Sequence, residues 1–159
     1  MTYILGFLGR LLLSLIFLFS SFGKLLNWDQ NVQYLAHSIQ FWQQQMGDIT
    51  EVQEIFHSFT PLLPLFLLVG LLLESIGSLL LLTGFRVKLG AFLLFIFLVP
   101  ATVIFHPFWA VESGDYNNQL IMFLKNLAIL GGLIMVLAQP GKISAKPAAA
   151  PDTSRRIAP

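Results

Sequence analysis

Four long apolar runs dominate the pattern of hydrophobic and polar positions along this chain. They cover about residues 4–26, 61–84, 88–106 and 118–138. Each run is long enough to cross a hydrocarbon core of about 30 Å as a helix. The pattern therefore predicts an all-α fold, an integral membrane four-helix bundle contained within residues 1–140.

The segments outside the runs predict how this bundle is completed. Residues 30–38 and 50–59 have the pattern of short extra helices in the first connection, which is too long for a simple turn. Pro100 falls inside the third run and removes one backbone hydrogen bond, so we expect that helix to bend. Residues 141–159 are rich in proline, alanine and charge, which predicts a disordered tail.

The composition agrees with a membrane protein and excludes several kinds of chemistry. Hydrophobic residues make up 56% of the 159 residues and charged residues only 11%. A net charge of +1 without a basic cluster argues against a nucleic-acid partner. The chain contains no cysteine, which excludes thiolate catalysis, disulfide exchange and ligation of an iron–sulfur cluster. We therefore expect no intrinsic cofactor and no independent enzyme activity.

Charges outside the runs predict the orientation of the chain. Arg and Lys occur in the short link after the second run, at Arg86 and Lys88, and in the C-terminal tail. The connections at about 27–60 and 107–117 contain acidic residues and no Arg or Lys. Because basic residues stay on the cytoplasmic side, both termini should be cytoplasmic. A cleaved signal peptide is the alternative for the first run, but the run continues past residue 20 and no basic segment precedes it.

Polar side chains within the runs indicate where function lies, because a charge inside a membrane needs a partner or a cavity. The second run carries Glu74 on the same helical face as Gly70 and Gly77, whose small size permits close helix approach. The first run carries a polar stripe along one face, which should point into the bundle. The residues of this stripe are Arg10, Ser14, Phe17, Ser21 and Lys24.

Two of these charges are predicted to form an intramembrane ion pair, Arg10 with Glu74. Counting about 1.5 Å per residue places Arg10 about 9 Å and Glu74 about 15 Å from the inner edge, in the same half of the membrane. A charge-assisted pair would offset the desolvation of both groups. The alternative is that such a pair only fixes helix register, with Arg10 reaching the interface along its own stem.

A second group of residues, nearer the outer edge, is the candidate ligand site. Lys125 has no evident carboxylate partner, which suggests an anionic or carbonyl-bearing ligand such as a quinone or a phospholipid. The histidines do not pair at metal-ligand spacing, so we expect no metal site and no haem held between spans. The predicted ligand-binding residues are Lys125, Asn126, Lys24, His106, Trp109 and Met122.

Several short motifs together resemble the DoxX family of small bacterial membrane proteins. They are Gly9–Leu12, Phe22–Leu25, Leu73–Glu74, Leu82–Arg86, Phe105–Trp109 and Phe123–Ala128. The resemblance covers about residues 9–137 and implies a four-helix protein of the bacterial inner membrane. It also implies that Arg10, Lys24, Glu74, His106, Lys125 and Asn126 occupy the family's characteristic polar positions. No catalytic role carries over, because the family has no agreed mechanism.

Three functions fit these observations. Some members of the family belong to quinone-linked redox assemblies, so the resemblance favours an accessory or membrane subunit of a redox-linked complex, with a protein partner. That hypothesis requires a headgroup-sized pocket beside Lys125 or a partner that carries electrons. A small transporter or permeability factor would instead need a continuous hydrated path along the stripe from Arg10 to Lys24. The third alternative is a structural assembly subunit whose charges only set helix register.

Overall fold

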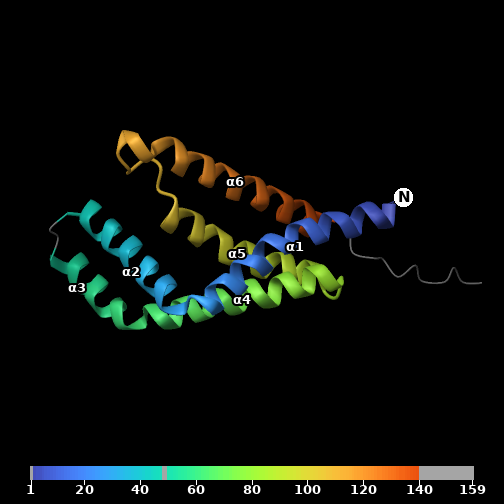
Figure 1. Cartoon of the computed structure of the whole chain (residues 1–159), viewed down its shortest axis with the longest axis horizontal. Coiled ribbons are helices and arrows are strands. Elements are labelled where there is room, and N and C mark those ends of the chain that lie inside the picture. Colours follow the sequence, from blue (N-terminus) through green and yellow to red (C-terminus); the bar gives the residue numbers. More distant parts are fainter. Residues whose placement is uncertain (1, 48–49, 140–159) are drawn as a thin grey trace, which may run out of the picture.

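Four membrane-length helices form the body of the protein. A computed structural model describes residues 2–47 and 50–139 (Figure 1). Within these ranges the four helices that are long and apolar enough to cross a membrane are α1 (Thr2–Leu26), α4 (Leu63–Thr83), α5 (Val87–Phe105) and α6 (Ser113–Ala138). The predicted all-α, four-helix membrane fold is confirmed. The predicted disordered tail, 141–159, lies outside the described residues.

The first connection contains more helix than the sequence pattern predicted. The helix expected at 30–38 is α2, which runs from Trp28 to Gln45, and it is followed by α3 (Thr50–Phe59) and the 3-10 turn η1 (Thr60–Leu62). The chain passes from α1 into α2 through a bend at Asn27. Its backbone N–H donates to the Gly23 carbonyl at 3.1 Å, and its carbonyl accepts from the Asn31 N–H at 3.0 Å. Helical hydrogen bonding therefore continues across the bend.

Two apolar clusters hold the helices together. α4 packs between α1 and α5, and α6 packs mainly on α5. The first core joins the four long helices and consists of Phe17, Leu81, Ala91, Leu94, Leu98, Leu130, Leu133 and Val136. The second core joins α2 to α4, through Leu35, Leu63 and Leu67, with Ile104 and Phe105 of α5 packed against it. α2 thus completes the bundle at the end opposite the chain's N-terminus (Figure 1).

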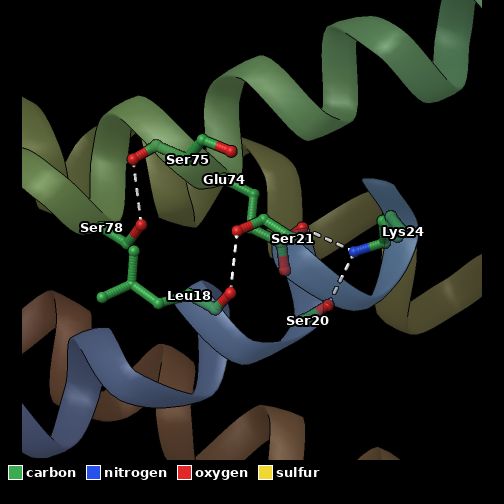
Figure 2. Close-up of polar contacts among 7 residues, drawn as sticks. All are labelled: Leu18, Ser20, Ser21, Lys24, Glu74, Ser75 and Ser78. Atoms are coloured by element: carbon green, nitrogen blue, oxygen red, sulfur yellow. Dashed lines mark hydrogen bonds and ion pairs between the residues drawn. The ribbon is translucent and has the colours of Figure 1, made fainter. Parts of the chain in front are cut away.

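The faces predicted to point inward are buried. Along the stripe of α1, Ser14, Phe17 and Ser21 are almost fully buried. The Ser21 hydroxyl donates to the Leu18 carbonyl at 3.1 Å, and the Ser78 hydroxyl of α4 donates to the Ser75 carbonyl at 3.0 Å (Figure 2). Because these hydroxyls bond within their own helices, the helices can approach closely without unpaired polar groups.

Glycines allow the closest helix contact, between α4 and α5. A Cβ atom added to Gly77 would lie 2.8 Å from Leu94 Cγ and 3.0 Å from the carbonyl oxygen of Gly90. A Cβ added to Gly90 would lie only 2.7 Å from the carbonyl oxygen of Gly77. The close approach predicted for the glycine face of α4 is therefore confirmed, with Gly90 as its partner across the interface.

Candidate functional site

A buried ion pair joins the end of α1 to the middle of α4. The Lys24 ammonium donates to Glu74 Oε2 at 2.5 Å and to the Ser20 hydroxyl at 2.7 Å (Figure 2). The side chain of Glu74 is 1% exposed and that of Lys24 is 17% exposed. It is the only salt bridge among the residues whose side chains the structure describes, 3–47 and 53–139. Direct pairing compensates a carboxylate that would otherwise be buried without a counter-charge.

This pairing corrects the predicted Arg10–Glu74 pair. The prediction counted the depth of Arg10 from the start of the first apolar run and that of Glu74 from the end of the second, and took both points as the inner edge of the membrane. The structure instead places Arg10 level with Gly84, at the end of α4. In the structure, α2 continues beyond the bend at Asn27 and packs along the first half of α4. The end of α1 therefore lies beside the middle of α4, which brings Lys24 rather than Arg10 to Glu74.

Arg10 contacts the other end of α4. Its guanidinium lies against Gly84, where an added Cβ atom would be 3.5 Å from one terminal nitrogen and 3.8 Å from the other. Gly84 has a φ of +78° and ends α4 in the left-handed conformation that glycine adopts without strain. The polar stripe of α1 therefore contacts α4 at two points. Lys24 reaches the middle of α4, and Arg10 reaches its C-terminus.

A cavity of about 540 Å³ opens beside the ion pair, between the first and second cores. Its wall is mostly apolar, with Phe66 and Phe97 among its aromatic residues. All five of the longest helices contribute to it, although α6 supplies only Asn126 and Ile129. The polar side chains that line it are Ser20, Lys24, Asn31, Tyr34, Glu74, His106 and Asn126.

Lys24 retains a donor for a molecule in this cavity. An ammonium group carries three N–H donors, and Glu74 and Ser20 accept two of them. The ammonium also lies 5.0 Å from the centre of the Phe97 ring, within the range of a cation–π contact. An acceptor such as a carbonyl oxygen could therefore bind Lys24 while the ion pair stays intact.

The cavity wall also contains a backbone carbonyl that lacks its regular helical donor. Pro100 has no N–H, so the carbonyl of Ile96 lacks its usual helical partner in α5. Ile96 and Pro100 are one helical turn apart and both line the cavity. The free carbonyl consequently lies on the side of α5 that faces the cavity, where it can accept a hydrogen bond from a ligand hydroxyl.

Aromatic and amide contacts fix the wall near the end of α5. The rings of Tyr34 and Phe105 are stacked, with centroids 5.2 Å apart and planes 10° apart. His106 Nδ1 lies 3.0 Å from Gln119 Oε1, and the Gln119 amide donates to Asp115 at 3.1 Å. In the part of the chain that the structure describes, no three His, Asp or Glu side chains come together as a metal site.

The structure separates the predicted ligand-binding residues into two groups. Lys24, His106 and Asn126 line the cavity, whereas Lys125, Met122 and Trp109 do not and are exposed. On α6 the cavity is lined by Asn126 and Ile129, which are three residues apart, and the exposed Lys125 side chain lies outside it. Trp109 packs instead in an aromatic cluster with Trp42, Phe108 and Phe123.

Sequence reasoning did not identify many of the lining residues, and Ser20, Asn31, Tyr34 and Phe97 are examples. Ser20 is four residues from Lys24, at the spacing of one helical turn, which was an available signal. Asn31 and Tyr34 share a face of α2, but their role depends on α2 packing into the bundle. Phe97 is one of many phenylalanines in apolar runs, and nothing in the pattern distinguishes it.

Comparisons with known proteins agree with this membrane architecture. Residues 5–107 match the sequence profile of the family described as DoxX. The chain is also similar to "Inner membrane protein YphA" of Escherichia coli (strain K12), with 25% identity over 142 residues. That alignment covers 89% of this chain and 87% of the relative. No solved structure matches the chain.

Proposed function

The chain belongs to the DoxX family, and on that premise we propose that it is an inner-membrane protein whose cavity binds a quinone or lipid headgroup. We propose further that it acts as an accessory or membrane subunit of a redox-linked complex. The inner-membrane location is supported by the name of the relative from Escherichia coli and by the four membrane-length helices.

The observation that carries this proposal is the charged pair at the side of an apolar cavity. A volume of about 540 Å³ lies within the usual range of small-molecule sites, which are mostly apolar with a few placed polar groups. Lys24 and Glu74 supply these groups, with a donor of Lys24 still available. The cavity has room for a headgroup, while an attached apolar tail would extend into the surrounding lipid.

The wall suggests how a quinone ring would be held. One ring carbonyl would accept a hydrogen bond from Lys24, with the ring placed against Phe97 and the stacked pair of Tyr34 and Phe105. The hydroxyl of a reduced ring could donate to the free carbonyl of Ile96. A glycerol or phosphate headgroup would use the same donor and acceptor but would gain less from the aromatic wall.

The electrons of such a complex would come from a partner protein. The chain has no cysteine, and its histidines do not provide a facing pair at depth for haem. An electron carrier would therefore be bound by another subunit, while this protein would hold the quinone or lipid beside it.

No observation supports a transporter as the charged pair beside the cavity supports a ligand site. A transport path along α1 would have to connect Arg10 with Lys24. Between them, Ser14, Phe17 and Ser21 are 0%, 3% and 5% exposed and are packed against neighbouring helices. The polar stripe is therefore filled by protein in this conformation.

Two matched variants test the ligand site. The double variant Lys24→Met/Glu74→Met removes both charges together, which avoids leaving one of them buried and unpaired. Lys125→Met is the control, because it removes an exposed lysine of α6 that does not line the cavity. After purification in mild detergent, mass spectrometry should show that the double variant loses bound quinone or lipid while Lys125→Met retains it. Equal retention by the folded double variant would overturn the ligand site.

The same purification tests the partner. If the protein belongs to a redox-linked complex, a protein that carries flavin, haem or an iron–sulfur cluster should co-purify with the wild-type chain. Recovery of the ligand-loaded protein without any such partner, after chemical cross-linking in intact membranes, would contradict the subunit role and leave the ligand site standing.

A further inference from the structure

We propose that the turn between α4 and α5, together with Arg10, binds the phosphate group of an anionic phospholipid. This site is separate from the cavity and does not depend on the proposed function. Its first support is the charged Arg10 side chain, which reaches from α1 to this turn. Its guanidinium lies against Gly84, where an added Cβ atom would be 3.5 Å from one terminal nitrogen and 3.8 Å from the other. A guanidinium binds phosphate oxygens through charge-assisted hydrogen bonds.

Two more cations lie on the same turn. Arg86 and Lys88 are two and four residues beyond Gly84, and Arg86 is the residue immediately before α5. Arg86 has φ 48° and ψ 48°, the only positive φ of a non-glycine residue among those described. A residue other than glycine or asparagine is strained in this conformation. Such strain is commonly retained where a side chain has a functional position.

The start of α5 adds unpaired backbone donors. The Gly90 N–H donates to the Arg86 carbonyl at 3.1 Å, which is the first hydrogen bond of the helix. The N–H groups of Val87, Lys88 and Leu89 consequently have no partner within the helix. Free N–H groups and the positive end of the helix dipole favour an anion at this position. The guanidinium of Arg10 and the cations of the turn favour the same ligand.

No carboxylate in the described residues can neutralise these cations. α1 contains none, and neither do residues 75–111 or 116–139. Glu74, the single acidic residue of α4, is paired with Lys24 farther along the bundle. The turn lies at the same end of the molecule as the N-terminus and the end of α6 (Figure 1). Three cations therefore gather at one membrane edge without a counter-charge from residues 2–47 or 50–139.

A phospholipid fits this edge better than a dissolved anion. Phe85 and Leu89 flank the cations and are exposed, so an acyl chain could pack against them. The Arg86 guanidinium lies 5.7 Å from the centre of the Phe85 ring, which places charge and apolar surface side by side. Anionic lipids are concentrated in the leaflet that faces basic loops.

The test is native mass spectrometry of the full chain titrated with phosphatidylglycerol or with phosphatidylcholine of the same acyl composition. Wild type should prefer phosphatidylglycerol. Arg86→Asn should weaken its binding about fivefold, the usual contribution of one cation near a lipid surface. Asparagine tolerates a positive φ, so this variant should be at least as resistant to unfolding as wild type. Lys125→Gln removes an exposed lysine elsewhere and should leave phosphatidylglycerol binding unchanged.

Three outcomes would overturn the proposal. One is unchanged phosphatidylglycerol binding by Arg86→Asn. Another is an equal loss with Lys125→Gln, which would show a bulk charge effect. The third is displacement of the lipid by an equal concentration of inorganic phosphate, which would show a site for the free anion. Arg10→Gln is a separate check on Arg10. If the folded variant is less stable but binds phosphatidylglycerol as wild type does, Arg10 only caps the C-terminus of α4 and is not part of the lipid site.

Discussion

At the scale of single residues, Lys24 determines how a carboxylate can be held inside the bundle. Glu74 is 1% exposed, and an isolated ionised carboxylate at such a position would be strongly unfavourable. Lys24 supplies the opposite charge at 2.5 Å, and Ser20 orients the ammonium from one turn away. The pair also faces the cavity, so the interaction that stabilises Glu74 positions the donor for a ligand.

The first prediction concerns the partner of Glu74. Glu74→Ala should lower the free energy of unfolding by about 3–5 kcal/mol, because Lys24 would be left buried without its counter-charge. In a double-mutant cycle, measured by unfolding in mixed micelles, Lys24→Met and Glu74→Ala should be strongly non-additive. The matched cycle of Arg10→Met with Glu74→Ala should be additive. Coupling to Arg10 instead of Lys24 would contradict the structure.

The sequence predicted the face of each residue better than its depth. Helical periodicity placed Ser14, Phe17 and Ser21 on a buried face, because that periodicity is a local property of the helix. The partner of Glu74 depended on where α1 ends relative to α4. Only the continuation of the chain into α2 determines that offset, and the apolar run gave no sign of it.

At the scale of helices, α4 is the element around which the others are arranged. It packs on α1, α2 and α5 and supplies residues to both cores and to the cavity. Glycine faces are readable from sequence, so the close approach at Gly77 was predictable. Its partner Gly90 and the length of α2 were not, because both depend on tertiary packing.

The second prediction tests the contact between α4 and α5. Gly77→Ala would force its new methyl group against Leu94 and the Gly90 carbonyl. The free energy of unfolding should therefore fall by about 1–3 kcal/mol. Gly9→Ala is the control, since a Cβ at Gly9 meets nothing within 4 Å. Alanine favours a helix over glycine by about 0.5–1 kcal/mol, so this control should be neutral or stabilising. If both variants behave alike in micelle unfolding, the close contact does not exist.

At the scale of the whole molecule, basic and acidic residues lie towards opposite ends of the bundle, and the cavity lies between its two cores. The basic turn at Arg86 lies at one end, and the described acidic residues of α2, α3 and the start of α6 lie towards the other (Figure 1). The cavity lies between the two cores, where the first core gives way to the packing of α2. The sequence indicated which charges matter, but the cavity arises only from the packing of five helices.

The third prediction concerns orientation in the membrane. The basic turn should be cytoplasmic, which places both termini inside and the start of α6 outside. The chain has no cysteine, so single cysteines can be introduced without a background signal. In intact cells an impermeant thiol reagent should label Gly114→Cys and should not label Ser144→Cys. Labelling of Ser144→Cys alone would reverse the orientation.

The most direct measurement of the central claim is to map where a photoreactive quinone analogue attaches to the purified full chain. If the cavity beside Lys24 and Glu74 binds a quinone headgroup, cross-linked peptides should come from its wall, at Tyr34 of α2 or at Phe97 and Phe105 of α5. Unlabelled quinone should suppress this attachment, and Lys24→Met/Glu74→Met should abolish it. Attachment around Lys125 and Met122, or attachment to the cavity wall that unlabelled quinone does not reduce, would contradict the account.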